Sequence, residues 1–240
     1  MARRRYHHGD LRTALLDAAE ALVRERGTQG WSLREASARV GVSPSAAYHH
    51  FASRDVLVRA VSERVLARLG TRMSEAAGRA SYDATEDDPL RRIVAVGRGY
   101  VRWAVEEPAV ARLVFGAGVT DSESAISPHP HDVLAAELDR LLASGGLTAS
   151  AREGAEFVVW AAVHGLAMLL IDGLMRLDGT QEIDREAERV VRAVVRGLTT
   201  ETAPPLPWPA PRSAHTEHLA AVRFGTAAPG EANEPRSIDS

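Results

Sequence analysis

The sequence predicts an all-α protein built from two helical parts, and three observations carry that prediction. Apolar residues recur at helical spacing through most of residues 10–200. No stretch alternates β-branched with polar residues as a half-buried strand would. Capping residues and glycines divide the first part, residues 9–70, into short helices, whereas the helices expected in the second part, residues 89–202, are mostly longer.

The first part begins with two predicted helices. Residues 10–26 carry apolar side chains on one face, and Gly27 is a suitable stop just past the last turn. Ser32 and Glu35 have the spacing of a capping box, in which the serine accepts from the third helical amide and the glutamate reaches back to the cap. A second helix is therefore expected from there to about Val40.

A tight turn and a very short third helix follow. Gly41 can adopt the positive φ of the turn, and Ser43 can cap the next helix. Pro44 suits the first position of that helix, where its missing amide costs nothing. We expect this helix to end near His50, and Ser53 then caps a fourth, longer helix that closes the first part.

The second part is expected to be helical between breaks at proline and glycine. Residues 71–88 are expected to hold the end of the connecting helix and a linker, polar over 78–88, and the segment 116–130 is expected to be a loop. The segment 151–175 is so apolar through its middle that we expect it to be enclosed on nearly all sides. The helices are expected at 89–107, 132–143, 151–175 and 184–200.

Both ends of the chain are expected to be flexible. Residues 1–8 form a basic arm with three consecutive arginines, which could also enter a minor groove. Residues 203–240 are rich in proline, alanine, glycine and polar residues without periodicity, which indicates a disordered tail.

Composition excludes several classes of protein. The chain has 240 residues and no cysteine, which rules out disulfides, thiolate zinc sites and cysteine nucleophiles. The longest apolar run, Phe157 to Ile171, is 15 residues, short of the roughly 20 that a membrane span needs. No signal peptide is recognisable at the start, so we expect a cytoplasmic protein.

Charge is divided unevenly between the two parts. Residues 1–70 hold 12 arginines against 7 acidic residues, so this region is basic although the whole chain carries a net charge of -3. A basic first part on an acidic remainder indicates that a polyanion docks at the first part.

The short helices at 32–51 have the geometry of a DNA-reading unit. A helix of about two turns fits the major groove, and here it would face base edges with one side while Ala47 and Phe51 point inward. We expect Ser45, Ala46 and His49 to face bases. The full set of candidate DNA contacts is Ser32, Arg34, Ser43, Pro44, Ser45, Ala46, Tyr48, His49, His50 and Arg54.

Residues 41–57 read Gly-Val-Ser-Pro-Ser-Ala-Ala-Tyr-His-His-Phe and, one residue later, Ser-Arg-Asp-x-Leu, which resembles the helix-turn-helix of the TetR family. The resemblance implies phosphate contacts by Tyr48, His50 and Arg54, and a homodimer that reads a roughly palindromic operator. It also implies a repressor released by a small-molecule effector. Two positions depart from the pattern, since Ala47 replaces a larger aliphatic residue and Arg54 replaces the usual lysine.

A second resemblance lies in the C-terminal part. Trp160-x-x-x-His164-Gly165, together with residues 6–12, is similar to a TetR subgroup named for its Trp-His-Gly (WHG) signature. That signature implies no particular ligand.

His164 is unusual because an ionisable ring inside an apolar run must be hydrogen-bonded or line a cavity. A satisfied core histidine is one interpretation. The other is a pocket for a mainly apolar ligand, with Tyr100, Trp103, Trp160 and His164 as its candidate lining.

Three further interpretations compete with a ligand-responsive DNA-binding homodimer. An α-helical enzyme would use His164 with Asp172, which share a helix face, although no catalytic motif supports it. Metal at His7-His8 or at His129 and His131 lacks a complete ligand set, and we expect no cofactor or metal. A constitutive or architectural DNA-binding factor without a ligand is the third. We expect dimerisation through the last two helices, which would form a four-helix bundle with those of a partner.

Overall fold

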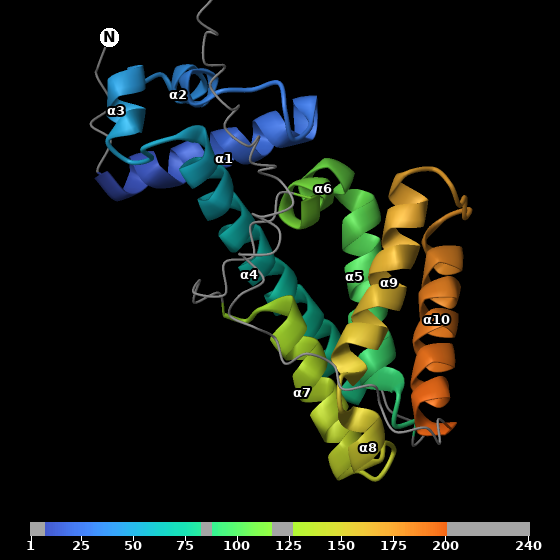
Figure 1. The fold of residues 1–240 in the computed structure, drawn as a ribbon. Coiled ribbons are helices and arrows are strands. Elements are labelled where there is room, and N and C mark those ends of the chain that lie inside the picture. Colours follow the sequence, from blue (N-terminus) through green and yellow to red (C-terminus); the bar gives the residue numbers. More distant parts are fainter. Residues whose placement is uncertain (1–7, 83–87, 117–126, 201–240) are drawn as a thin grey trace, which may run out of the picture.

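A computed structural model describes residues 8–82, 88–116 and 127–200 and confirms the all-α prediction, because these residues form ten helices and no strand (Figure 1). The expected flexible tail, and all but the last residue of the basic arm, lie outside the described residues. The helices are α1 His8–Arg26, α2 Leu33–Val40, α3 Pro44–Tyr48, α4 Arg54–Tyr82, α5 Arg91–Glu106, α6 Pro108–Gly116, α7 Pro130–Ala143, α8 Ala149–Arg152, α9 Ala155–Ile171 and α10 Thr180–Thr200.

The helices α1, α2 and α3 gather at one end of α4, and we call this unit, with the first half of α4, the head (Figure 1). Its core contains Trp31, Leu33, Ala47 and Phe51, all buried. The helices α5 to α10 and the second half of α4 form the body.

The long helix α4 belongs to both units. The sequence predicts that the first part closes near residue 70 and that the end of a connecting helix and a linker follow over 71–88. In the structure α4 continues without interruption to Tyr82. Leu57 and Val61 near its start are buried, as are Met73 and Ala77 in its second half, where it packs against α5. A single uninterrupted helix therefore runs from the head into the body.

Two pairs of segments in the body approach each other closely at a glycine. At Gly70 of α4, an added Cβ would lie 1.9 Å from the carbonyl oxygen of Pro128, so the chain entering α7 crosses directly over α4. At Gly97 of α5, an added Cβ would lie 2.7 Å from a methyl group of Val191 on α10. Only glycine permits these separations.

The predicted helix over 151–175 is wrong in two respects. It is divided into α8 and α9 at Gly154, which has a φ of 70°. It is also not enclosed, because α9 packs against α5, α7 and α10 while Val158 and Leu169, about three turns apart on one side, are 47% and 44% exposed. A single chain supplies no neighbour for that surface among the described residues.

Other differences are smaller. The segment that begins at Pro108 forms a helix, α6, which is not predicted from the sequence. The last helix begins at Thr180, four residues earlier than expected, directly after Gly179 with its φ of 83°. Within the described ranges, no helix is both long and apolar enough to cross a bilayer.

Candidate DNA-reading surface and ligand cavity

Local hydrogen bonds fix the two helices of the reading unit. The hydroxyl of Ser32 accepts from the amide of Glu35 at 3.2 Å, and the Glu35 carboxylate accepts from the Ser32 amide at 2.9 Å, so the predicted capping box is present. Gly41 ends α2 with a φ of 79°, and Ser43 caps α3 by accepting from the amide of Ala46 at 3.2 Å. The angle between α2 and α3 is thus set by residues close together in sequence.

The side chains expected to contact bases lie on the outer side of α3. Ser45 and His49 are exposed and Ala46 is half-buried, whereas Ala47 is fully buried beneath them. The helix ends at Tyr48, two residues before the predicted end at His50.

The remaining candidates for DNA contact differ in how accessible they are. Pro44, Ser43 and Tyr48 are exposed on or beside α3, and Arg34 is exposed on α2. His50 and Ser32 are half-buried, and the Ser32 hydroxyl is engaged in its cap. The structure thus brings most of these side chains to one region, around the turn between α2 and α3.

Arg54 is held by the protein itself. Its Nε donates to the carbonyl of Trp31 at 3.1 Å, and Nη2 donates to the carbonyl of Thr28. Its guanidinium also lies 4.4 Å from the ring centre of Trp31. These contacts tie the start of α4 to the loop before α2, and the phosphate role expected for Arg54 stays a prediction.

Ion pairs neutralise part of the positive charge of the head. Arg39 binds Glu25 at 2.7 Å, and Arg26 binds Glu35 at 2.5 Å. Arg12, which is not among the predicted contacts, is exposed, with its guanidinium 5.2 Å from the ring centre of Phe51 at the end of the reading unit. A basic residue in the first turns of the first helix is the only sequence signal for it.

The four residues predicted to line a pocket do meet in the body. The Tyr100 hydroxyl lies 2.7 Å from Nδ1 of His164, and the ring centre of Trp160 lies 4.9 Å from that of Tyr100. Trp103 is 6.1 Å from Tyr100 by the same measure. Phe115 of α6 joins this aromatic cluster, with its ring centre 5.1 Å from that of His164. Phe115 is not among the predicted lining residues because the sequence does not predict α6.

Burial governs ionisation within this cluster. It lowers the pKa of His164, which is therefore neutral at pH 7, and it raises the pKa of Tyr100. With the imidazole proton on Nε2, the neutral phenol donates to Nδ1, so the hydroxyl and Nδ1 satisfy each other. This favours the interpretation of His164 as a hydrogen-bonded core residue in the present structure.

The cavity next to the aromatic cluster is small. Its volume is about 10 Å³, room for one water molecule and far below the roughly 300 Å³ at which ligand pockets begin. Tyr100 and Trp160 line it, but Trp103 and His164 do not. Its lining residues are Met73, Ile93, Val96, Gly97, Tyr100, Leu134, Val159, Trp160 and Val163.

The other candidates have structural partners. Nδ1 of His129 accepts from the amide of His131 and caps α7. Asp172, the proposed enzymatic partner of His164, binds Arg112 at 2.7 Å instead. The described residues contain no group of three or more potential metal-ligating side chains.

Both parts of the chain match models of one family. The model described as "Bacterial regulatory proteins, tetR family" matches residues 15–61. The model described as "Tetracyclin repressor-like, C-terminal domain" matches residues 93–194.

Curated relatives include transcriptional regulators named BetI. The regulator of Brucella anthropi is 30% identical over 112 residues, which are 47% of this chain and 56% of the relative. That of Brucella canis is 30% identical over 104 residues, 43% of this chain and 50% of the relative. The chain thus spans about half the length of the curated relatives it matches.

Solved structures match over more of the chain. A protein of unknown function from Rhodococcus has a TM-score of 0.62 and 26% identity, covering 82% of this chain and 100% of its own. A TetR-family regulator from Pectobacterium atrosepticum has a TM-score of 0.58 and 20% identity, covering 83% and 99%. The resemblance to the WHG subgroup stays a prediction, but with both parts matched, this chain belongs to the TetR family.

Proposed function

We propose that this protein is a sequence-specific DNA-binding transcription regulator that acts as a homodimer in the cytoplasm and has no catalytic activity. The observation that carries the proposal is α3, a short helix with exposed polar side chains, fixed by caps at Ser43 and Gly41 over a buried Ala47. Such a helix, held firmly and presented outward, is what major-groove reading requires.

Base contacts are assigned to Ser45, Ala46 and His49, and phosphate contacts to Arg34, Tyr48 and His50. The test is selection of bound sequences from a random DNA pool, followed by the same selection with His49→Ala. A good base contact discriminates by about 1 to 3 kcal/mol, so His49→Ala should relax preference at particular positions only. A wild-type chain that enriches no sequence, or a variant that weakens all sequences equally, contradicts this proposal.

The role of Arg54 is tested separately because it has structural contacts. If Arg54 binds a DNA phosphate, Arg54→Ala should flatten the dependence of binding on salt by about 1 unit. If Arg54 only ties α4 to the carbonyls of Trp31 and Thr28, the variant unfolds at lower temperature and keeps the wild-type salt slope.

Dimerisation is assigned to α9 and α10. The uncovered apolar side chains of α9, Val158 and Leu169, fit a surface that a second copy covers, and Ala193 and Gly197 on α10 are small and exposed. Two α9–α10 pairs would make a four-helix bundle with the two heads on the same side.

Ligand response is assigned to the aromatic cluster, with repression relieved when an apolar ligand enters. Because the present cavity holds about one water, a ligand would have to displace side chains there, and its binding would favour a different body conformation. Coupling is typically about 1 to 3 kcal/mol and reciprocal, so operator DNA must weaken the ligand by the factor by which the ligand weakens DNA.

The same small cavity favours one alternative, a constitutive DNA-binding factor without a ligand. A screen for compounds that shift both the thermal stability and the operator affinity of the protein distinguishes a ligand-responsive regulator from a constitutive factor. A ligand with equal affinity for free and operator-bound protein would not be the effector, and chemical conversion of such a compound would overturn the non-enzymatic assignment.

A further inference from the structure

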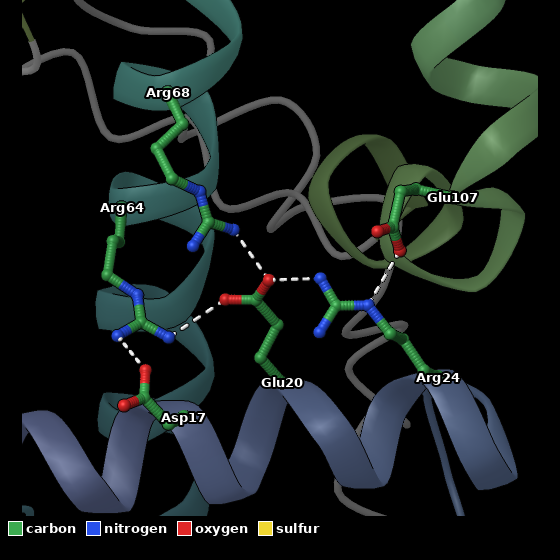
Figure 2. Close-up of polar contacts among 6 residues, drawn as sticks. All are labelled: Asp17, Glu20, Arg24, Arg64, Arg68 and Glu107. Atoms are coloured by element: carbon green, nitrogen blue, oxygen red, sulfur yellow. Dashed lines mark hydrogen bonds and ion pairs between the residues drawn. The ribbon is translucent and has the colours of Figure 1, made fainter.

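A cluster of charged side chains joins the head to the body, and we call it the Glu20 cluster (Figure 2). Its members come from three places: α1, α4, and the junction between α5 and α6. They are Asp17, Glu20, Arg24, Arg64, Arg68 and Glu107.

The centre of the cluster is the buried carboxylate of Glu20, whose side chain is only 4% exposed. It accepts from Arg64 at 2.8 Å and from Arg68 at 2.5 Å, both on α4, and from Arg24 at 2.5 Å on its own helix. Burial alone would raise the pKa of Glu20, but the hydrogen bonds and charges of these arginines outweigh burial and lower it. Glu20 is therefore ionised and fastens α1 to α4.

The outer edge of the cluster is much more accessible to water. Nε of Arg24 donates to Glu107 at 2.7 Å, and the two side chains are 44% and 29% exposed. An exposed pair contributes little to stability, whereas a buried charge without its partners is costly. The pair of Arg24 and Glu107 can separate without removing any of the three arginines from Glu20, so the outer edge is the weaker side of the cluster.

Glu107 lies at the start of a path to the aromatic cluster. It follows the last residue of α5 and directly precedes Pro108, where α6 begins. The far end of α6 carries Phe115, whose ring centre lies 5.7 Å from that of Trp160. Arg112 of α6 also binds Asp172 at the end of α9. If a change in the aromatic cluster displaced α6, Glu107 at the start of α6 would therefore be displaced as well.

We propose that the Glu20 cluster is the joint that sets the orientation of the head on the body. Glu20 is its fixed anchor, because it holds α1 to the first half of α4 within the head, and the contact between Arg24 and Glu107 is the part that links the head to the body and opens. Glu107 is thus a positioning residue for DNA binding. In a dimer, the orientation of the two heads sets the spacing between operator half-sites that the dimer can bind. This inference rests on the proposed function. It adds the connection by which the body controls the reading heads.

The test compares Glu107→Gln with Glu106→Gln in the full-length chain. The two changes are adjacent, remove the same charge and each break one exposed ion pair, but Glu106 binds Arg72 of α4 and makes no contact with α1 among those described. Hydrogen exchange of the free protein and affinity for operators with stepwise altered half-site spacing are measured for both.

Glu107→Gln should speed exchange in α6 and in the last turns of α1 by a factor of about two to five, the range expected for an exposed ion pair. It should also broaden the range of half-site spacings that bind well while leaving the salt slope unchanged, because every phosphate-binding side chain is still present. Glu107→Asp should partly restore the wild-type spacing preference. Glu106→Gln should match the wild type in α1 exchange and in spacing.

Glu20→Gln is the second variant and should speed exchange at the same places by about tenfold or more, because the arginines around it then have no central counter-charge. If Glu20→Gln fails to fold, the comparison of Glu107→Gln with Glu106→Gln still tests the proposed joint. The proposed joint is overturned if Glu107→Gln and Glu106→Gln show identical hydrogen exchange in α1. It is also overturned if Glu107→Gln speeds exchange but leaves the preference for half-site spacing unchanged. If the wild type enriches no DNA, the proposed function fails, and exchange alone then decides whether the joint exists.

Discussion

The reading unit within the head and the body are each held in shape by interactions of different range along the sequence. In the head, the turn between α2 and α3 is fixed by caps that join residues three apart, such as Ser32 with Glu35 and Ser43 with Ala46. In the body, ion pairs join distant segments, such as Arg92 with Glu137 and Arg192 with Asp88. The shape of the reading unit is therefore a local property, whereas the shape of the body depends on many long-range interactions.

Under the proposed function, this difference would separate a fixed reading surface from a body that changes its packing. A reading helix must present the same side chains in every state, and short-range caps provide that without reference to the body. A body that responds to a ligand needs alternative packings, and its incompletely covered α9 and tightly packed aromatic cluster are the features that a partner or a ligand would change.

The largest expected effect comes from changing the surface of the body that the proposed dimer would bury. Leu169→Arg places a charge on the exposed apolar side of α9, where a partner would bury it without a counter-charge. The dimer should weaken by more than about 100-fold, as measured by light scattering over a dilution series. Val194→Arg on α10 should act in the same way.

The matched control is Ala136→Arg, which adds the same charge to an exposed position on α7. It should remain dimeric. Dimers of wild-type affinity in both Leu169→Arg and Val194→Arg would show that the interface lies elsewhere.

A second test uses one substitution at two places on α4, the helix shared by head and body. Gly70→Ala drives a methyl group into the carbonyl of Pro128 and should lower the free energy of unfolding by about 1 to 3 kcal/mol. Gly78→Ala meets no atom within 4 Å and should raise it by about 0.5 to 1 kcal/mol through better helix propensity. Denaturant unfolding at one protein concentration measures both, and equal effects would refute the crossing at Gly70.

Sequence-based prediction succeeded where the determining interactions are local. The capping box at Ser32, the turn at Gly41 and the break at Pro108 depend on residues within a few positions, so their signals are legible. The break at Gly154 is not predicted because an isolated glycine inside an apolar helical pattern is often tolerated, and only its φ of 70° reveals the break.

Sites that depend on distant partners could be predicted only in part. Tyr100 and His164 are 64 positions apart, and their residue types alone suggest a shared pocket, but neither their hydrogen bond nor the smallness of the cavity was predictable. The structural contacts of Arg54 were not predictable either, because its partners, the carbonyls of Thr28 and Trp31, are backbone atoms that carry no sequence signal.

The third prediction concerns the local interactions of the head. Ser32→Ala removes the capping hydroxyl of α2 and should lower the free energy of unfolding by about 1 kcal/mol. Ser74→Ala, at an exposed position within α4, is the control and should be neutral or slightly stabilising. A loss as large for Ser74→Ala as for Ser32→Ala would mean that the cap adds nothing to stability.

The smallest expected effect is a pH dependence that belongs to the body. Burial lowers the pKa of His164 in the folded protein below its ordinary value of about 6.5, so below that pH the unfolded chain binds more protons than the folded one. Stability should therefore fall as the pH falls from 6.5 toward 5, by less than about 1.4 kcal/mol per pH unit for one such group. Unfolding by denaturant at several pH values measures this slope.

His164→Asn tests the assignment because asparagine keeps an acceptor for the Tyr100 hydroxyl but does not titrate. The decline in stability between pH 6.5 and 5 should become shallower in this variant. The pKa of His129 is also lowered, chiefly by burial, although the charge of Asp132 opposes the shift, so His129→Asn should flatten the remaining slope in the same direction. If neither variant alters the slope, the group that makes stability acid-sensitive is neither of these two histidines. Because both histidines lie in the body, the pH dependence of stability would then no longer distinguish the body from the head.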